Sequence, residues 1–536
     1  MRIMSRFREQ RPSALLYALP LAAMTVCVGA VRLAGHDTWW HLATGWVITQ
    51  LGTIPRYDIF SFTAFGRPWV NHQWLYQALM WTVYDHLGVA GLVLMKVALF
   101  GATTWIAFRT VTYLARSRDL ALWATMFLLW GTANRALDRP YLIIMPMLAV
   151  YLLILHRYAR HGSRWIWALP FLQIIWINCH GGGMLGAIVV FCFAAGETMQ
   201  ALLPRRLGGP EPIGRARIRR LWIAGLACLA ACTINPWGAD IFTYYFNLSQ
   251  MSFALSRTLE WLPPLTPKTT DAIPPYLFLV SAAATLFSYA LNAKRVRISH
   301  LAISAFTVML LLRGNRFGPE MMIANLPLLA LNLSTRYPAL SSQRYASSWI
   351  SAGAATALAA TMLIIGVPTS LRSAPVNRMG LAPAKRFAPS RMVDFLEYHD
   401  IRGRGFNEML LGGYLIFRRW PQELVFYDGR SPVFGEELFR QHLEALYLAQ
   451  NLNSLIYRYE FDYLVFSAQK ALNNRRLHQY LWEDPDWHLV YGMDDGYIYL
   501  RDVPKFKERI EKLGLKKHPI IEHMKRKGEL PKDYQR

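Results

Sequence analysis

The chain has 536 residues, of which 54% are hydrophobic, 13% aromatic and only 17% charged. A water-soluble domain usually carries about 25% charged residues, so this composition excludes an ordinary soluble enzyme. Residues 1–369 hold 31 Lys and Arg against 12 Asp and Glu, whereas residues 370–536 hold 27 against 22. We therefore expect an apolar membrane domain over 1–369, a soluble domain over 370–503 and a basic tail over 504–536.

Eleven apolar segments are long enough, or nearly long enough, to cross a bilayer. They lie at 13–31, 89–113, 119–135, 140–156, 165–179, 183–203, 221–235, 273–292, 298–312, 318–333 and 346–367. Basic residues precede the first segment as in a signal peptide, but its apolar run is longer than usual and favours an uncleaved span. All five cysteines lie in apolar runs, which indicates small buried hydrophobic residues rather than a disulfide framework.

The basic residues between these segments predict an orientation. If the N-terminus is cytoplasmic, the cytoplasmic segments hold 20 Lys and Arg and the opposite side holds nine, as the positive-inside rule requires. Eleven spans then place the C-terminal domain, and a long first loop over 32–88, in the periplasm of a bacterium, with the chain in the cytoplasmic (inner) membrane. Basic cytoplasmic loops explain much of the formal net charge of +24, so we expect no nucleic-acid partner.

The periplasmic part predicts an α/β domain. Residues 423–427 and 462–466 have the pattern of buried strands, and a helical pattern over 436–449 separates them. Two further strands, 487–491 and 497–500, flank Asp494-Asp495-Gly496, which is a hairpin signal. The predicted fold class is a polytopic all-α membrane bundle of about 11 spans with a C-terminal periplasmic α/β domain.

The first predicted loop is the densest polar region of the membrane part. Asp37 lies just beyond the first span, where a carboxylate suits a general base or a ligand of a divalent cation; a helix N-cap is the alternative. Asp58 is a possible second ligand, so Mg or Mn bound by Asp37 and Asp58 is a candidate cofactor. The nearby histidines have no tight zinc spacing. The tryptophans fit sugar stacking or an interfacial aromatic belt. The aromatic candidates for acceptor or sugar contacts are Trp39, Trp40, His41 and His72.

These features resemble the GT-C class of membrane glycosyltransferases. An acid just past the first span, a long first periplasmic loop, many spans and a distal α/β domain are its shared pattern. The chain also resembles bacterial multi-span proteins that share Asn178-Cys179-His180-Gly181-Gly182-Gly183, Asn235-Pro236-Trp237-Gly238 and Asp428-Gly429-Arg430. The resemblance implies a polyprenyl-phosphate sugar as donor, inversion at the anomeric carbon, and Asp37 as base or metal ligand. The distal domain has no Trp-Trp-Asp motif, which argues against transfer to protein asparagine, and no adjacent Asp-Glu pair as in protein mannosyltransferases.

A lipid-phosphate leaving group needs cations at the outer membrane edge. Four arginines lie at predicted periplasmic span ends: Arg135, Arg139, Arg313 and Arg316. Snorkelling to the interface is the alternative for each of them. His180 precedes three glycines that would let backbone amides approach a phosphate, or that simply make a tight turn.

The predicted function is therefore transfer of a sugar from a lipid-phosphate donor to an envelope glycan, lipid or protein acceptor at the outer face of the membrane. Three alternatives stay open: a noncatalytic scaffold of an envelope-polysaccharide system, a transporter, and an acyltransferase built on His180. Glu197 is almost the only acid within an apolar run, which disfavours a transporter.

Overall fold

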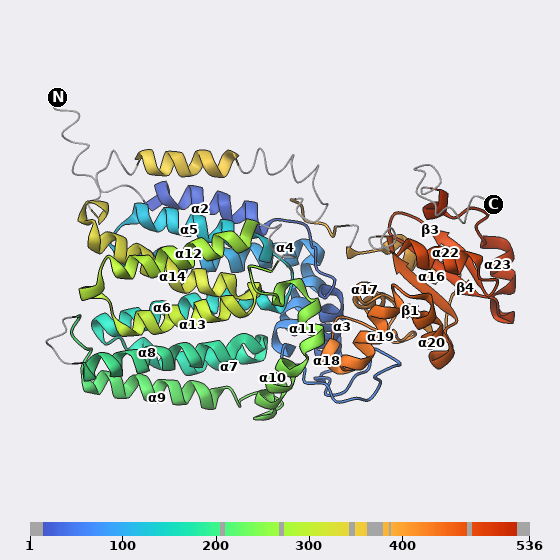
Figure 1. The fold of residues 1–536 in the computed structure, drawn as a ribbon, viewed down its shortest axis with the longest axis horizontal. Coiled ribbons are helices and arrows are strands. Elements are labelled where there is room, and N and C mark those ends of the chain that lie inside the picture. The colour runs from blue at the N-terminus through green and yellow to red at the C-terminus, as the bar shows by residue number, and fades with distance from the viewer. Residues whose placement is uncertain are drawn as a thin grey trace.

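A computed structural model describes residues 14–203, 209–266, 273–341, 349–361, 379–384, 387–468 and 474–522. Helices that run side by side form a bundle, and the C-terminal domain lies at one end of it (Figure 1). The predicted span 346–367 is described only over 349–361, and residues 523–536 of the basic tail lie outside the described residues.

Each predicted apolar segment is helical over most of its described length. The helices of the bundle are α2 (Ala14–Gly29), α4 (Trp74–Ala115), α5 (Arg118–Thr132), α6 (Ile144–His161), α7 (Leu169–Cys179), α8 (Met184–Leu202), α9 (Arg215–Ala231), α12 (Ile273–Ala290), α13 (Ile298–Arg313), α14 (Gly318–Arg336) and the helix over Trp349–Thr361. In the described part of the chain, three helical stretches are long and apolar enough to cross a membrane: Trp74–Ala115, Pro140–His161 and Gly181–Leu202. These stretches support a membrane bundle, while eleven spans and a cytoplasmic N-terminus stay predictions.

Local sequence explains where these helices start, bend and stop. The Ser117 side chain accepts the Leu120 amide at 3.3 Å and caps the start of α5. Helix α4 is interrupted at Gly88, whose φ of 60° and ψ of −155° are not helical. Glycine adopts this positive φ readily because it has no Cβ. The segment after Gly88 matches the predicted span 89–113. The segment before it belongs to the region between the bundle and the C-terminal domain.

The C-terminal domain contains a four-stranded sheet in the order β1-β2-β4-β3. Strand β1 (Gly405–Asn407) is parallel to β2 (Tyr463–Ser467), with Gly405 opposite Tyr463, and β2 is antiparallel to β4 (Gly496–Arg501). Strand β3 (Trp487–Gly492) and β4 form the predicted hairpin. The helices of this domain are α16 (Ser390–Tyr398), α17 (Met409–Arg419), α18 (Ser431–Phe434), α19 (Glu436–Ala445), α20 (Ala449–Tyr459), α22 (Arg475–Glu483) and α23 (Lys507–Leu513). Of these, α16, α17, α22 and α23 pack against strands of the sheet.

The predicted strand over 423–427 is wrong. Val425 makes only an isolated bridge, and its partner is Ser61 in the first predicted loop. The segment pairs with that loop instead of the sheet, and β1, three residues long, takes the position beside β2.

Residues 32–88 are more ordered than the predicted loop. They contain α3 (Thr38–Gln50), which packs against α17 of the C-terminal domain. The Trp39 indole donates to Phe387 O at 2.5 Å, and the Trp420 indole donates to Ile59 O at 2.8 Å. One hydrophobic core therefore runs from α3 into the C-terminal domain, which fixes that domain over the end of the bundle.

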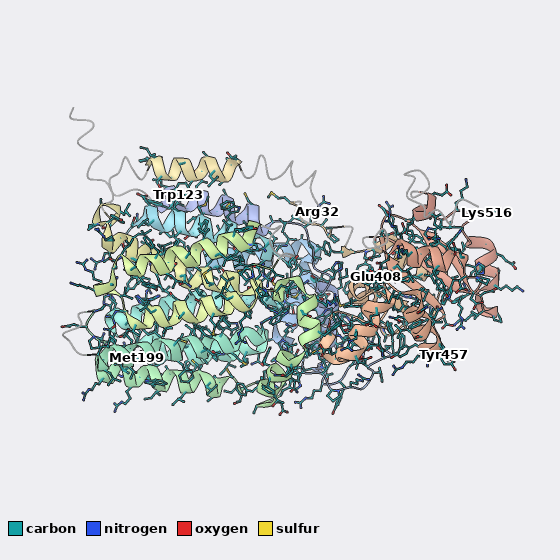
Figure 2. All side chains as sticks on the ribbon, viewed as in Figure 1. Arg32, Trp123, Met199, Glu408, Tyr457 and Lys516 are labelled. Carbon is teal, nitrogen blue, oxygen red and sulfur yellow. The ribbon has the colours of Figure 1, made fainter. Side chains whose placement is uncertain are left out.

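The helical bundle exposes many large hydrophobic side chains on its outer surface. Trp123 and Met199 lie on the helical bundle, whereas Tyr457 and Lys516 lie on the C-terminal domain (Figure 2). Exposed large hydrophobic side chains, such as Met199 and Trp105, are numerous on the bundle. Such a surface suits contact with lipid.

Candidate active site

A cavity of about 470 Å³ lies where the bundle, α3 and the C-terminal domain meet. Residues from four parts of the chain line it: Asp37, Trp40, His41 and Trp69–Gln73 from the first loop; Arg135, Arg139, Tyr141, His180–Gly182, Met184 and Leu185 from bundle ends; Tyr244, Tyr245, Glu260, Trp261 and Arg316 from later connections; and Gly429, Arg430, Pro432 and Val433 from the C-terminal domain. Both domains thus build one site.

Asp37 lies at the start of α3, but its side chain does not cap that helix. Its Oδ2 lies 3.3 Å from Arg139 Nε, and its Oδ1 accepts the Trp40 indole N–H at 3.3 Å. A Cβ placed on Gly429 would lie 2.2 Å from Asp37 Oδ1, so any larger residue there would displace this carboxylate. The Asp37 side chain is 25% exposed, so its carboxylate is accessible to a molecule in the cavity.

Arg135 and Arg316 converge on one acid, Glu260, in the short helix η6 (Leu259–Trp261). Arg135 Nη1 donates to Glu260 Oε2 at 2.7 Å, and Arg316 Nη1 lies 3.8 Å from Oε1. Burial alone would raise the pKa of Glu260, but the three cations Arg135, Arg316 and Arg139 outweigh it and lower the pKa to about 2. The cavity therefore holds an anion site that an internal carboxylate fills.

The arginines are also braced by aromatic rings. The Arg135 guanidinium lies 4.4 Å from the Tyr141 ring centroid, and that of Arg316 lies 4.0 Å from the Trp261 ring. Stacking of this kind orients a planar guanidinium without using its N–H donors. The rings therefore leave the guanidinium donors to Glu260, or to an anion that replaces it.

Three histidines line the cavity as neutral rings, because burial lowers the pKa of His41, His72 and His180, that of His72 to about 4. The His180 Nδ1 accepts the Gly182 amide at 2.8 Å, so the proton of the neutral ring is on Nε2. The Gln77 amide donates to His41 Nδ1 at 3.1 Å and is itself oriented by Asn71. These rings offer hydrogen bonds to the cavity rather than positive charge.

Asp58 is fully buried and is not among the residues that line the cavity. Its Oδ1 lies 2.6 Å from Arg430 Nη1, and its Oδ2 accepts hydrogen bonds from the backbone amide and the hydroxyl of Ser61. The other side of Arg430 pairs with Asp428 at 2.6 Å. Arg430 thus joins the first loop to the C-terminal domain, and its guanidinium lies 4.7 Å from the Trp69 ring.

Searches against protein-family models and against curated proteins find no match to this chain. Solved structures do match. The Archaeoglobus fulgidus oligosaccharyltransferase in its apo form aligns with 91% of this chain and 75% of its own, at 12% identity and a TM-score of 0.53. The AglB oligosaccharyltransferase of that organism, with an inhibitory peptide and a dolichol-phosphate, aligns with 92% and 75%, at 13% identity and 0.52. The chain has the GT-C fold.

ArnT from Cupriavidus metallidurans, bound to undecaprenyl phosphate, also aligns with 90% of the chain, at 11% identity and a TM-score of 0.49. The matches to the two oligosaccharyltransferase structures confirm the resemblance of the sequence to GT-C enzymes for the fold. Identities this low say nothing about individual residues, so the roles within the cavity rest on its own geometry.

The cavity gathers most of the site residues predicted from the sequence. Asp37, Trp40, His41, His72, Arg135, Arg139, His180 and Arg316 all line it. Trp39 instead packs edge-on against Tyr414 at 4.9 Å and joins α3 to the C-terminal domain. Arg313 ends α13 with an exposed side chain and does not line the cavity. Asp58 does not line the cavity, and its carboxylate lies against Arg430.

Several cavity residues could not be predicted from the sequence. No local pattern singles out Glu260, and Asp428-Gly429-Arg430 stands out only as a shared motif. Tyr141, Tyr244 and Tyr245 had no local signal. The pairing of Arg135 with Glu260 spans 125 residues, so only the folded chain reveals it.

The residues at Asp37 fit a divalent cation poorly. Hard cations prefer six or more oxygen ligands. In the described ranges no three His, Cys, Asp or Glu side chains cluster as a metal site, and Asp58 points to Arg430 instead of joining Asp37. Binding of Mg or Mn stays a prediction.

Proposed function

We propose that the chain transfers a sugar from a polyprenyl-phosphate donor to an acceptor hydroxyl of an envelope glycan, lipid or protein. The observation that carries this proposal is one cavity that holds both Asp37, which lies beside Arg139, and the anion site of Arg135 and Arg316. A carboxylate and clustered cations in one cavity are the two elements that glycosyl transfer from a phosphate requires.

In the proposed reaction, the donor phosphate displaces Glu260 and binds Arg135 and Arg316. The acceptor oxygen attacks the anomeric carbon, and its proton moves to Asp37. The bond between the anomeric carbon and the phosphate oxygen breaks, and its electron pair stays on the phosphate, where the arginines stabilise the added charge. A single displacement of this kind inverts the anomeric carbon.

The walls of the cavity are consistent with a lipid donor. Leu185 and Ile188 of α8 and Leu310 of α13 form an apolar side, and Ile188 is partly exposed on the bundle surface. An isoprenoid chain would lie against such residues while its phosphate reaches the arginines. The neutral His180 and His72 rings would supply hydrogen bonds to the phosphate or the sugar.

A transfer assay tests this function. Purified protein in detergent or nanodiscs would be incubated with a panel of radiolabelled polyprenyl-phosphate sugars and with envelope lipid, glycan and protein fractions. We expect labelled product and free polyprenyl phosphate with at least one donor. Retention of all label on every donor would favour the scaffold alternative, and movement of intact donor across a sealed vesicle would favour the transporter.

A further inference from the structure

Lys96 is a lysine inside an apolar helix, and it is fully buried. Burying an ammonium group there is costly unless it is paired. Lys96 Nζ lies 3.0 Å from Asp138 Oδ2, and it donates to Val31 O at 2.9 Å. Neither Lys96 nor Asp138 lines the cavity, so a substrate would touch neither of them.

The two partners of Lys96 lead directly to the two charged groups at one side of the cavity. Asp138 precedes Arg139 in the chain, and Val31 belongs to the segment that leads into Asp37. The Asp138 backbone oxygen also accepts the Thr38 hydroxyl at 2.9 Å. Thr38 follows Asp37, so residues 37–38 and 138–139 are joined twice: once in the cavity, by Asp37 and Arg139, and once behind it.

We propose that Lys96 and Asp138 are positioning residues that hold Asp37 and Arg139 at their working separation; this rests on the proposed function, in which Asp37 is the base. The ion pair anchors the Asp138 backbone, which in turn anchors Thr38. A variant that lacks this anchor still contains Asp37 and Arg139, but the segments 37–38 and 138–139 can shift apart. A shift of about 1 Å at a reacting group costs roughly 10²-fold in rate.

The main test is the double variant Lys96→Met/Asp138→Asn, which removes both buried charges together and leaves neither unpaired. We expect kcat to fall about 10- to 100-fold, while KM for the donor stays close to wild type because Arg135 and Arg316 are untouched. The matched control is Glu197→Gln/Arg297→Gln. It removes another ion pair with a fully buried acid, Glu197, whose oxygen lies 2.9 Å from Arg297; neither residue lines the cavity. Its kcat should stay at the wild-type value.

A milder pair of variants keeps the proposal testable if the double variant fails to insert. Thr38→Val removes the hydroxyl without changing size, and Thr38→Ser restores it. We expect Thr38→Val to lower kcat about tenfold and Thr38→Ser to recover most of it, at equal melting temperatures. A wild-type kcat in Thr38→Val or in a folded double variant, while Asp37→Asn is inactive, would overturn the positioning role. Full activity of Asp37→Asn would instead overturn the proposed function.

Discussion

Glu260 lies between two arginines that come from distant parts of the chain, with Oε2 2.7 Å from Arg135 Nη1 and Oε1 3.8 Å from Arg316 Nη1. A carboxylate held in this way occupies the place that the proposed reaction assigns to a phosphate. Donor binding would therefore be a competition between an internal and an external anion for the same guanidinium groups.

Removing the internal anion should strengthen donor binding. Glu260→Gln keeps the size of the side chain and frees both arginines, so we expect KM for the polyprenyl-phosphate donor to fall about three- to tenfold. Steady-state kinetics with one sugar donor checks this. A higher KM in Glu260→Gln would mean that Glu260 contacts the substrate rather than competing with it.

The same pairing predicts a dependence of stability on pH. The pKa of Glu260 is about 2 in the folded chain, below the roughly 4.3 of a free Glu, so its ion pairs stabilise the folded state above about pH 4.3 and lose that effect as the pH falls towards 2. The melting temperature of the wild type should therefore exceed that of Glu260→Gln by a constant amount from pH 5 to 8. The difference should shrink below about pH 4. A difference independent of pH down to 3 would contradict the lowered pKa.

Two arginines three residues apart should differ in their effect on the donor. Arg316 lines the cavity, whereas Arg313 is exposed and lies outside it. We expect Arg316→Gln to raise donor KM about tenfold or more, since hydrogen bonds to charged groups contribute about 1.5–3 kcal/mol, and Arg313→Gln to leave KM unchanged. Equal effects would indicate that both arginines act through the membrane surface potential.

The buried pair of Asp58 and Arg430 should matter for stability. Asp58→Asn weakens a 2.6 Å ion pair with both side chains at most 2% exposed, so we expect a loss of about 1.5–3 kcal/mol of unfolding free energy. The control is Asp494→Asn, which breaks an ion pair whose side chains are both 63% exposed and should cost less than about 1 kcal/mol. Denaturation of the two variants in the same detergent compares them. Equal stability would show that Arg430 does not join the two domains.

The features that could be predicted from the sequence are those that depend on residues close together in the chain. Apolar segments gave the helices, and Asp494-Asp495-Gly496 gave the turn between β3 and β4. Strand β1 is too short, at three residues, to show a period. Residues 423–427 have a strand-like pattern, but their backbone bridges Ser61 of the first loop and bonds to β1 only through the Asn407 side chain. The cavity was predicted through Asp37 and the arginines at helix ends, whereas Glu260 and Lys96 gain their significance only from partners 125 and 42 residues away.

The most direct test of the central claim is the single-turnover rate of sugar transfer by Asp37→Asn, measured with the donor that the wild type uses. Asparagine keeps the size of the side chain and cannot accept the acceptor proton, and loss of a general base costs about 10²- to 10⁴-fold in rate. We predict a loss in this range at an unchanged melting temperature and with normal binding of polyprenyl phosphate. A wild-type rate in Asp37→Asn would contradict the account.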